Sequence, residues 1–106
     1  EKINGVDFAL VVKDGANRDE LTNIGDSLKA NRSDYIFILV GGNNGAYPVI
    51  VFTKGNGTNI AKAGDIVKSL ASTLGGGGGG RPEMASGSLK SIDGIEGLAN
   101  AIKAKI

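Results

Sequence analysis

Tyr35-Ile36-Phe37-Ile38-Leu39-Val40 is a run of six apolar and aromatic residues, and the fold can be read outward from it. A strand with one face in solvent alternates apolar and polar residues, whereas a strand covered on both faces is apolar throughout. The run therefore predicts a strand in the middle of a sheet. A second strand is predicted at Val6–Val12, which is rich in β-branched residues and ends at the turn-forming pair Asp14-Gly15.

A helix is predicted between these two strands. Asn17 stands three residues before Glu20, which is the spacing of a capping box. Apolar residues then follow at helical intervals as far as about Ala30, namely Leu21, Ile24 and Leu28. Because a helix that joins two strands of one sheet makes a right-handed crossover, we expect the strands to be parallel.

A β-hairpin is predicted after the central strand. Residues 41–45 are Gly-Gly-Asn-Asn-Gly, which tolerate positive φ, and the apolar run Val49–Phe52 follows them. Pro48 has no N–H, so it is expected at the start of the strand or on an unpaired edge.

Two further helices are predicted in the second half of the chain. Thr58 or Asn59 can cap the first, which reaches Leu74 with apolar residues three or four apart. Asp93 and Glu96 have capping-box spacing and open the last helix, whose apolar stripe is Ile95, Leu98, Ile102 and Ile106. The expected fold class is α/β, a mixed β-sheet packed with helices in the order β-α-β-β-α-glycine loop-α, and residues 1–106 are expected to form one domain.

The composition excludes most familiar kinds of active site. The chain has no His and no Cys, so it has no imidazole base, no thiol nucleophile, no zinc site of these residues and no disulfide. We therefore expect no catalytic residue and no metal site in it. Lys and Arg number 12 against 11 Asp and Glu, and a net charge of +1 does not indicate a strongly basic nucleic-acid binder. Any basic site has to be local, and residues 54–106 hold 7 basic and 4 acidic side chains.

The chain also lacks signals for membrane insertion or export. No apolar run approaches the roughly 18 residues that suggest a membrane span, and the first four residues have no signal-peptide pattern. A soluble domain is expected. The first residue is Glu1, which indicates a fragment of a longer protein or a processed product.

Six consecutive glycines occupy positions 75–80, in a chain where glycine reaches 18 of 106 residues. Composition alone favours a flexible linker, but only 26 residues follow Gly80, too few for a second core. Bare backbone can come close to a phosphate or ribose and present several N–H donors, and Arg81 adds a positive fork. A P-loop would end in Gly-Lys-Ser/Thr, and a dinucleotide fingerprint would follow a strand, so neither motif fits.

The segment Gly75–Ala85, Gly-Gly-Gly-Gly-Gly-Gly-Arg-Pro-Glu-Met-Ala, together with Lys62–Lys68, resembles the C-terminal domain of alanyl-tRNA synthetase, within the DHH-associated domain family. The resemblance extends over nearly the whole chain and includes the strand-helix-hairpin-helix order. Histidine usually follows the glycines in the phosphodiesterase branch of this family, so Arg81 favours the synthetase branch. The sequence departs from the usual family string at Glu83 and at 86–88, Ser-Gly-Ser.

This resemblance implies a noncatalytic domain that binds the elbow of tRNA, the outer corner of the L-shaped molecule. Upstream domains of the same synthetase would charge alanine tRNA and hydrolyse wrongly charged tRNA, so a shared handle would link aminoacylation with editing. The resemblance implies no cofactor in this domain, whereas the parent enzyme, an ATP-dependent alanine–tRNA ligase, would use ATP, Mg and a zinc ion held upstream. It also implies a cytoplasmic location.

The residues expected to contact tRNA are Gly78, Gly79, Gly80, Arg81, Lys54, Lys62, Lys68 and Lys90. Pro82 and Met84 are expected to anchor the loop by packing. Lysines on an amphipathic helix, as expected for Lys62 and Lys68, usually belong only to its solvated face. Two other functions stay open: a nucleic-acid-binding accessory domain of a DHH-family phosphodiesterase or exonuclease, and self-association, for example as a homodimer.

Overall fold

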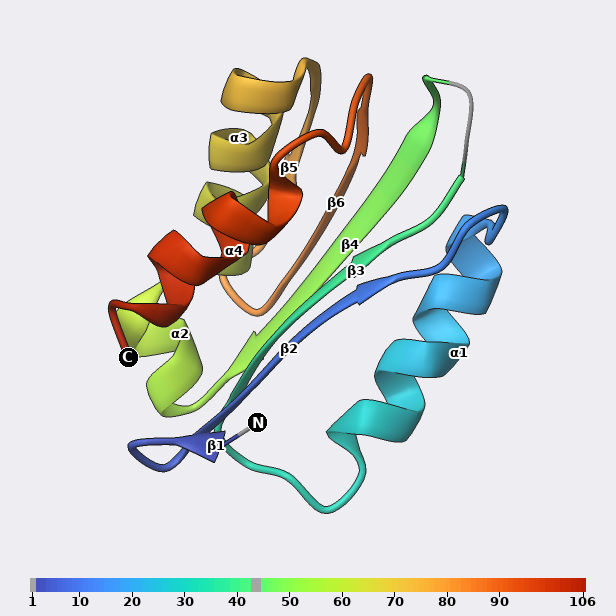
Figure 1. Ribbon diagram of the computed structural model, residues 1–106. Coiled ribbons are helices and arrows are strands. Elements are labelled where there is room, and N and C mark those ends of the chain that lie inside the picture. Colours follow the sequence, from blue (N-terminus) through green and yellow to red (C-terminus); the bar gives the residue numbers. More distant parts are fainter. Residues whose placement is uncertain (1, 43–44) are drawn as a thin grey trace.

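In a computed structural model, which describes residues 2–42 and 45–106, the chain forms a mixed β-sheet with helices on both faces (Figure 1). In chain order the elements are β1 (Lys2–Ile3), β2 (Val6–Val12), α1 (Arg18–Lys29), β3 (Tyr35–Val40), β4 (Tyr47–Lys54), α2 (Asn56–Ile60), α3 (Ala63–Leu74), β5 (Gly76–Gly80), β6 (Met84–Leu89) and α4 (Ile95–Lys103). The described strands form one sheet in the order β1-β2-β3-β4-β6-β5. The predicted α/β class is confirmed.

Strand β3 lies in the middle of the sheet, as its apolar composition predicted. All six residues of β3 are buried, and β3 pairs with β2 in parallel and with β4 in antiparallel orientation. The predicted parallel pair and the predicted hairpin are therefore confirmed, although residues 43–44 of the hairpin turn lie outside the described residues. Pro48 is the second residue of β4, as its missing N–H requires near the start of a strand.

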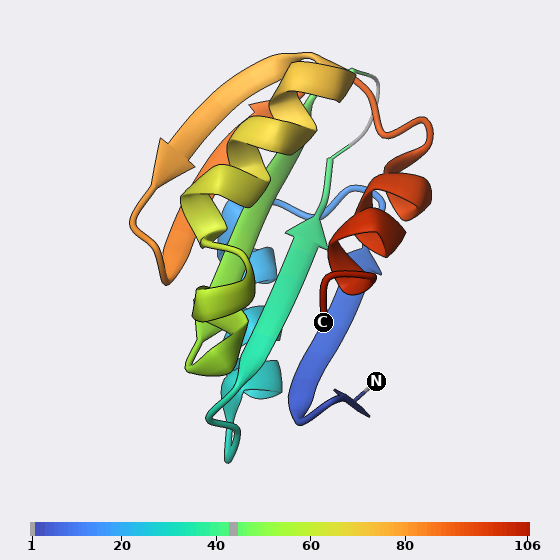
Figure 2. The same ribbon diagram turned by 90° about the vertical axis from the view of Figure 1, so that its left-hand side faces the viewer.

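The two faces of the sheet carry separate cores. Helix α1 covers one face, where Leu21 packs with Phe37 and Phe52. Helices α3 and α4 cover the other face, which Figure 2 shows with β5 and β1 at opposite edges of the sheet. The capping box predicted for α1 is present, because the Glu20 N–H donates to Asn17 Oδ1 (2.9 Å) and the Asn17 N–H donates to Glu20 Oε1 (3.2 Å).

The helix predicted from Thr58 or Asn59 to Leu74 is wrong as one element, because the chain forms α2 and α3 instead. Ala61 and Lys62 interrupt it with extended backbone (ψ 123° and 142°). The break leaves the Ala63 N–H free to donate to the Pro82 carbonyl at 2.8 Å. Apolar periodicity continues across such a break, so only the tertiary hydrogen bond reveals it.

The capping box predicted at Asp93 and Glu96 is also wrong. Helix α4 begins at Ile95, and its N-cap is Gly94 in a left-handed conformation (φ 80°) with no side-chain cap. The Asp93 N–H instead donates to Ser91 Oγ at 3.0 Å. The extra residue between Asp93 and the helix places its carboxylate out of capping position.

The glycine segment, predicted as a loop, is strand β5, and the loose stretch after it is strand β6. The two strands pair antiparallel, and β6 lies between β4 and β5. A Cβ atom on Gly78 would lie 2.5 Å from the Cα of Gly87 and 3.0 Å from Val67 Cγ1 of α3. Glycine has little strand propensity of its own, so the close approach to β6 and α3 makes this segment a strand.

Glycine is required at alternate positions of β5, so substitutions at neighbouring positions are expected to differ in their effect on stability. Gly78→Ala places a methyl group against the β6 backbone at a residue with φ 150°, so it is expected to lower the free energy of unfolding by about 2 kcal/mol. Gly77→Ala meets no atom within 4 Å and is expected to change it by less than about 0.5 kcal/mol. Urea unfolding of both variants checks this, and equal losses would contradict the alternation.

Candidate functional site

Strand β5 forms an edge of the sheet whose outward side consists of bare backbone. Hydrogen bonds from the Arg81 N–H to the Met84 carbonyl (2.9 Å) and from the Lys90 N–H to the Gly75 carbonyl (3.1 Å) flank its ladder with β6. Peptide groups of an antiparallel strand point alternately toward and away from its neighbour. Gly77 and Gly79 therefore face β6, and the N–H and C=O groups of the remaining strand residues face outward, namely those of Gly76, Gly78 and Gly80. All three are exposed.

Positive side chains lie along this edge. An added Cβ on Gly79 would lie 3.5 Å from Lys68 Cε, and one on Gly75 would lie 3.3 Å from Lys90 Cβ. Arg81 follows β5 directly and is exposed. Lysine and arginine side chains thus flank the glycine strand from its start to its end.

The other two predicted lysines lie near the turn after β5. Lys62 is the N-cap of α3, directly before Ala63, whose N–H donates to the Pro82 carbonyl. Lys54 ends β4 and lines a hollow of about 440 Å³ together with Arg81. The structure therefore brings seven of the eight residues predicted to contact tRNA to β5 and the segments beside it, whereas Lys54 lies at the end of the inner strand β4, in the hollow that Arg81 also lines. We refer to the whole set as the glycine edge: Gly78, Gly79, Gly80, Arg81, Lys54, Lys62, Lys68 and Lys90.

The two residues predicted to anchor the segment differ in their contacts. The Pro82 carbonyl accepts hydrogen bonds from the Ala63 N–H (2.8 Å) and from the Thr53 hydroxyl (2.7 Å). Met84 lies opposite Phe52 in the ladder of β4 and β6, and 38% of its surface is exposed. Thr53 and Ala63 were not singled out from the sequence, because no local pattern links them to a turn about twenty to thirty residues away.

Two aromatic residues, Tyr35 and Phe52, line the hollow beside Arg81. Tyr35 stacks on Phe37 with ring centroids 4.8 Å apart, and Lys29 Nζ lies 4.2 Å from the centre of the Phe52 ring. Burial, and secondarily the negative charge of Glu83, raises the pKa of Tyr35 above its usual value. The phenol therefore stays neutral at neutral pH, so among the described residues the acidic side chains that line this hollow are only those of Asp26 and Glu83.

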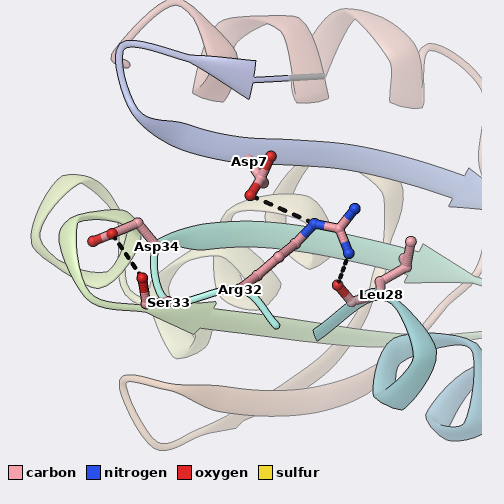
Figure 3. Close-up of polar contacts among 5 residues, drawn as sticks. All are labelled: Asp7, Leu28, Arg32, Ser33 and Asp34. Carbon is pink, nitrogen blue, oxygen red and sulfur yellow. Dashed lines mark hydrogen bonds and ion pairs between the residues drawn. The ribbon is translucent and has the colours of Figure 1, made fainter. Parts of the chain in front are cut away.

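A larger hollow of about 530 Å³ lies beside β1 and β2, away from the glycine edge. Arg32, which lines this hollow, already has partners within the chain. Its Nε lies 3.5 Å from Asp7 Oδ2, and its Nη1 donates to the Leu28 carbonyl (Figure 3). Ser33 donates to Asp34 Oδ2 at 3.3 Å. These contacts tie the end of α1 to β2, so we interpret this cluster as structural.

Neither a metal-ligand cluster nor a membrane-spanning helix occurs among the described residues. Residues 2–42 and 45–106 contain no group of three or more Asp, Glu, His or Cys side chains that could hold a metal ion. No helix in this part of the chain combines the length and apolar character needed to cross a membrane.

Comparisons with known proteins converge on one family. A family model described as the DHHA1 domain matches residues 5–106. The alanine–tRNA ligase of Carboxydothermus hydrogenoformans is 32% identical over 105 residues, which are 99% of this chain and 12% of that protein. The alanine–tRNA ligase of Staphylococcus epidermidis is 36% identical over 87 residues, which are 82% of this chain and 10% of that protein. The chain thus spans only a small part of these relatives.

A solved structure shares the fold. The C-Ala domain from Aquifex aeolicus alanyl-tRNA synthetase matches with a TM-score of 0.75 at 18% identity, covering 94% of this chain and 88% of that one. The resemblance seen in the sequence is therefore matched by the relatives and by the arrangement of strands and helices.

Proposed function

Because the chain belongs to the DHHA1 domain family, we propose that it is a tRNA-binding domain of an alanyl-tRNA synthetase and performs no chemistry itself. The observation that carries the proposal is the glycine edge, where bare backbone donors lie beside four positive side chains and a fifth, Lys54, lines the adjoining hollow. The alanine–tRNA ligases among the relatives, and Arg81 directly after the glycines, favour this parent over a DHH-family phosphodiesterase.

The chemistry of the glycine edge suits a nucleic-acid backbone. Along a strand, outward peptide groups recur every second residue, roughly 7 Å apart. Without side chains on β5, phosphate and ribose oxygens can approach the N–H donors, and 2′-hydroxyls can donate to the carbonyls. Arg81 offers a planar fork that matches a phosphate, and the lysines add positive charge. Such a site reads the shape and backbone of RNA more than its base sequence.

In this proposal residues 1–106 act as one domain that holds the elbow of alanine tRNA. The parent is a cytoplasmic ligase that uses ATP, Mg and a zinc ion held in other domains. One held tRNA has a raised effective concentration at both the aminoacylation centre and the editing centre. The domain therefore links the two activities by position alone.

Arg81→Ala tests the central cation of the site. The variant is expected to weaken binding of an alanine tRNA transcript by about tenfold in 0.1 M salt, because a charged hydrogen bond to phosphate is lost. The matched control is Arg18→Ala, which removes an exposed arginine at the start of α1 that does not line the hollow beside Arg81. Fluorescence anisotropy of labelled tRNA measures both affinities, and equal affinities for the variant and the control would contradict the assignment.

The salt dependence of binding tests the number of phosphate contacts. If about four of the five cations contact phosphates, the logarithm of the association constant falls with the logarithm of salt concentration with a slope of about −3. In Arg81→Ala the slope is expected to become shallower by about 0.7 to 0.9. A slope that is near zero in the parent chain would exclude a phosphate-binding site.

Gly79→Ala tests whether the bare backbone itself touches tRNA. The added methyl group makes only an ordinary contact with Lys68 at 3.5 Å, so the fold is expected to remain stable while tRNA affinity falls about fivefold. Gly97→Ala in α4 is the control, since its added methyl meets nothing within 4 Å and lies away from β5. Undiminished affinity of Gly79→Ala would show that tRNA does not contact β5 at this position.

A further inference from the structure

The geometry points to Thr53 as a positioning residue that holds the turn carrying Arg81 in the orientation needed to bind tRNA. This inference rests on the proposed function, because it concerns the same site. It assigns a role to a buried residue of β4 that touches no ligand. Thr53 would act through a chain of hydroxyl groups that ends on the backbone of the turn.

Thr53 is unusual in its burial. It is 1% exposed and is the only polar residue in the buried class among residues 2–42 and 45–106. A buried hydroxyl destabilises a fold unless it is hydrogen-bonded, and valine has nearly the same shape without that cost. The hydroxyl at this position therefore has to be explained by what it binds.

The direction of its hydrogen bonds follows from the number of protons. Thr53 Oγ1 donates to the Pro82 carbonyl at 2.7 Å, which uses its only proton. The contact of 2.8 Å between Thr53 Oγ1 and Thr58 Oγ1 then requires Thr58 as the donor. The chain of donors runs from α2 through β4 to the turn between β5 and β6.

Main-chain bonds complete the support of this turn. The Thr53 N–H donates to the Glu83 carbonyl at 3.0 Å, and the Ala63 N–H donates to the Pro82 carbonyl at 2.8 Å. Both lone pairs of the Pro82 carbonyl are therefore occupied, and proline itself has no N–H to offer. The Thr53 hydroxyl is the one side-chain group in this support, so it is the contact that a substitution can remove while the backbone bonds remain.

The orientation of the turn matters because the direction of the Arg81 side chain is set by the backbone of the turn alone. It is exposed and takes part in neither of the two ion pairs found among the described residues. A two-pronged contact with phosphate needs the guanidinium plane in a defined position, and binding groups lose affinity when their supporting residues are loose. A more mobile turn would keep the positive charge at the site, but the Arg81 guanidinium group would adopt many orientations.

Thr53→Val and Thr53→Ser separate this role from a purely structural one. The valine variant keeps the shape and loses the hydroxyl, whereas the serine variant keeps the hydroxyl and loses a buried methyl group. Both are expected to unfold at lower urea concentration than the parent chain. At a temperature where all chains are folded, Thr53→Val is expected to bind alanine tRNA transcript roughly fivefold more weakly, and Thr53→Ser within twofold of the parent. Equal affinities of the two variants would overturn the inference.

A double-mutant cycle with Arg81→Ala tests whether Thr53 acts through Arg81. In the Arg81→Ala background, Thr53→Val is expected to cause no further loss of affinity, because the group that it positions is gone. An undiminished fivefold loss in that background would overturn the inference. If Thr53→Val does not fold, Thr58→Val serves in the same cycle, since it removes the donor to Thr53 from a half-buried position of α2.

A measurement without RNA gives an independent readout. Backbone amide NMR of Thr53→Val is expected to show broadened signals at 81, 83 and 84, with signals in α1 unchanged, whereas Thr53→Ser keeps the parent spectrum at the turn. Sharp signals at the turn in Thr53→Val would contradict the role. Failure of this inference is distinguishable from failure of the proposed function. If the parent chain does not bind tRNA, the proposed function fails; if the parent chain binds tRNA and Thr53→Val binds it equally well, only the positioning role fails.

Discussion

Close contact between the backbones of β5, β6 and α3 is the constraint on which the candidate site depends. A Cβ atom on Gly78 would lie 2.5 Å from the Cα of Gly87, and one on Gly64 would lie 3.0 Å from the Gly80 carbonyl oxygen. Only glycine allows strands and helix to approach this closely. The contact turns a segment that is flexible by composition into an ordered strand, and it sets Lys68 and Arg81 beside bare peptide groups.

Ordering six glycines costs more conformational entropy than ordering other residues, so the structure has to offset that cost. The ladder with β6, the packing against α3 and the support of the turn by Thr53 and Ala63 contribute to this. The result is an open sheet edge, which in most proteins is a liability because it invites pairing with another strand. Exposed lysines beside β5 oppose such pairing, and in the proposed function the same charges attract an RNA backbone. One set of side chains thus serves both solubility and the proposed binding.

Local sequence patterns correctly predicted the elements whose structure depends on residues close together in the chain. The apolar run 35–40 is the buried central strand, Asn17 and Glu20 form the capping box of α1, and the hairpin follows. The cations of the candidate site were also chosen from the sequence, and the fold places them along β5 or, for Lys54, in the hollow beside Arg81. The prediction failed at β5 and β6, at the break before α3 and at the cap of α4, where the deciding partner lies elsewhere in the chain.

The sequence by itself determined the α/β class, the central strands and the family, because burial patterns and a distinctive glycine-Arg-Pro string are local properties. Only the tertiary structure decided that the glycines form an edge strand, which of them present their peptide groups outward, and that Thr53 supports the turn of Arg81. A glycine carries no side-chain preference, and its conformation is set by the backbone that it packs against. A hydrogen bond across 29 residues likewise exists only once the sheet has brought β4 beside β6.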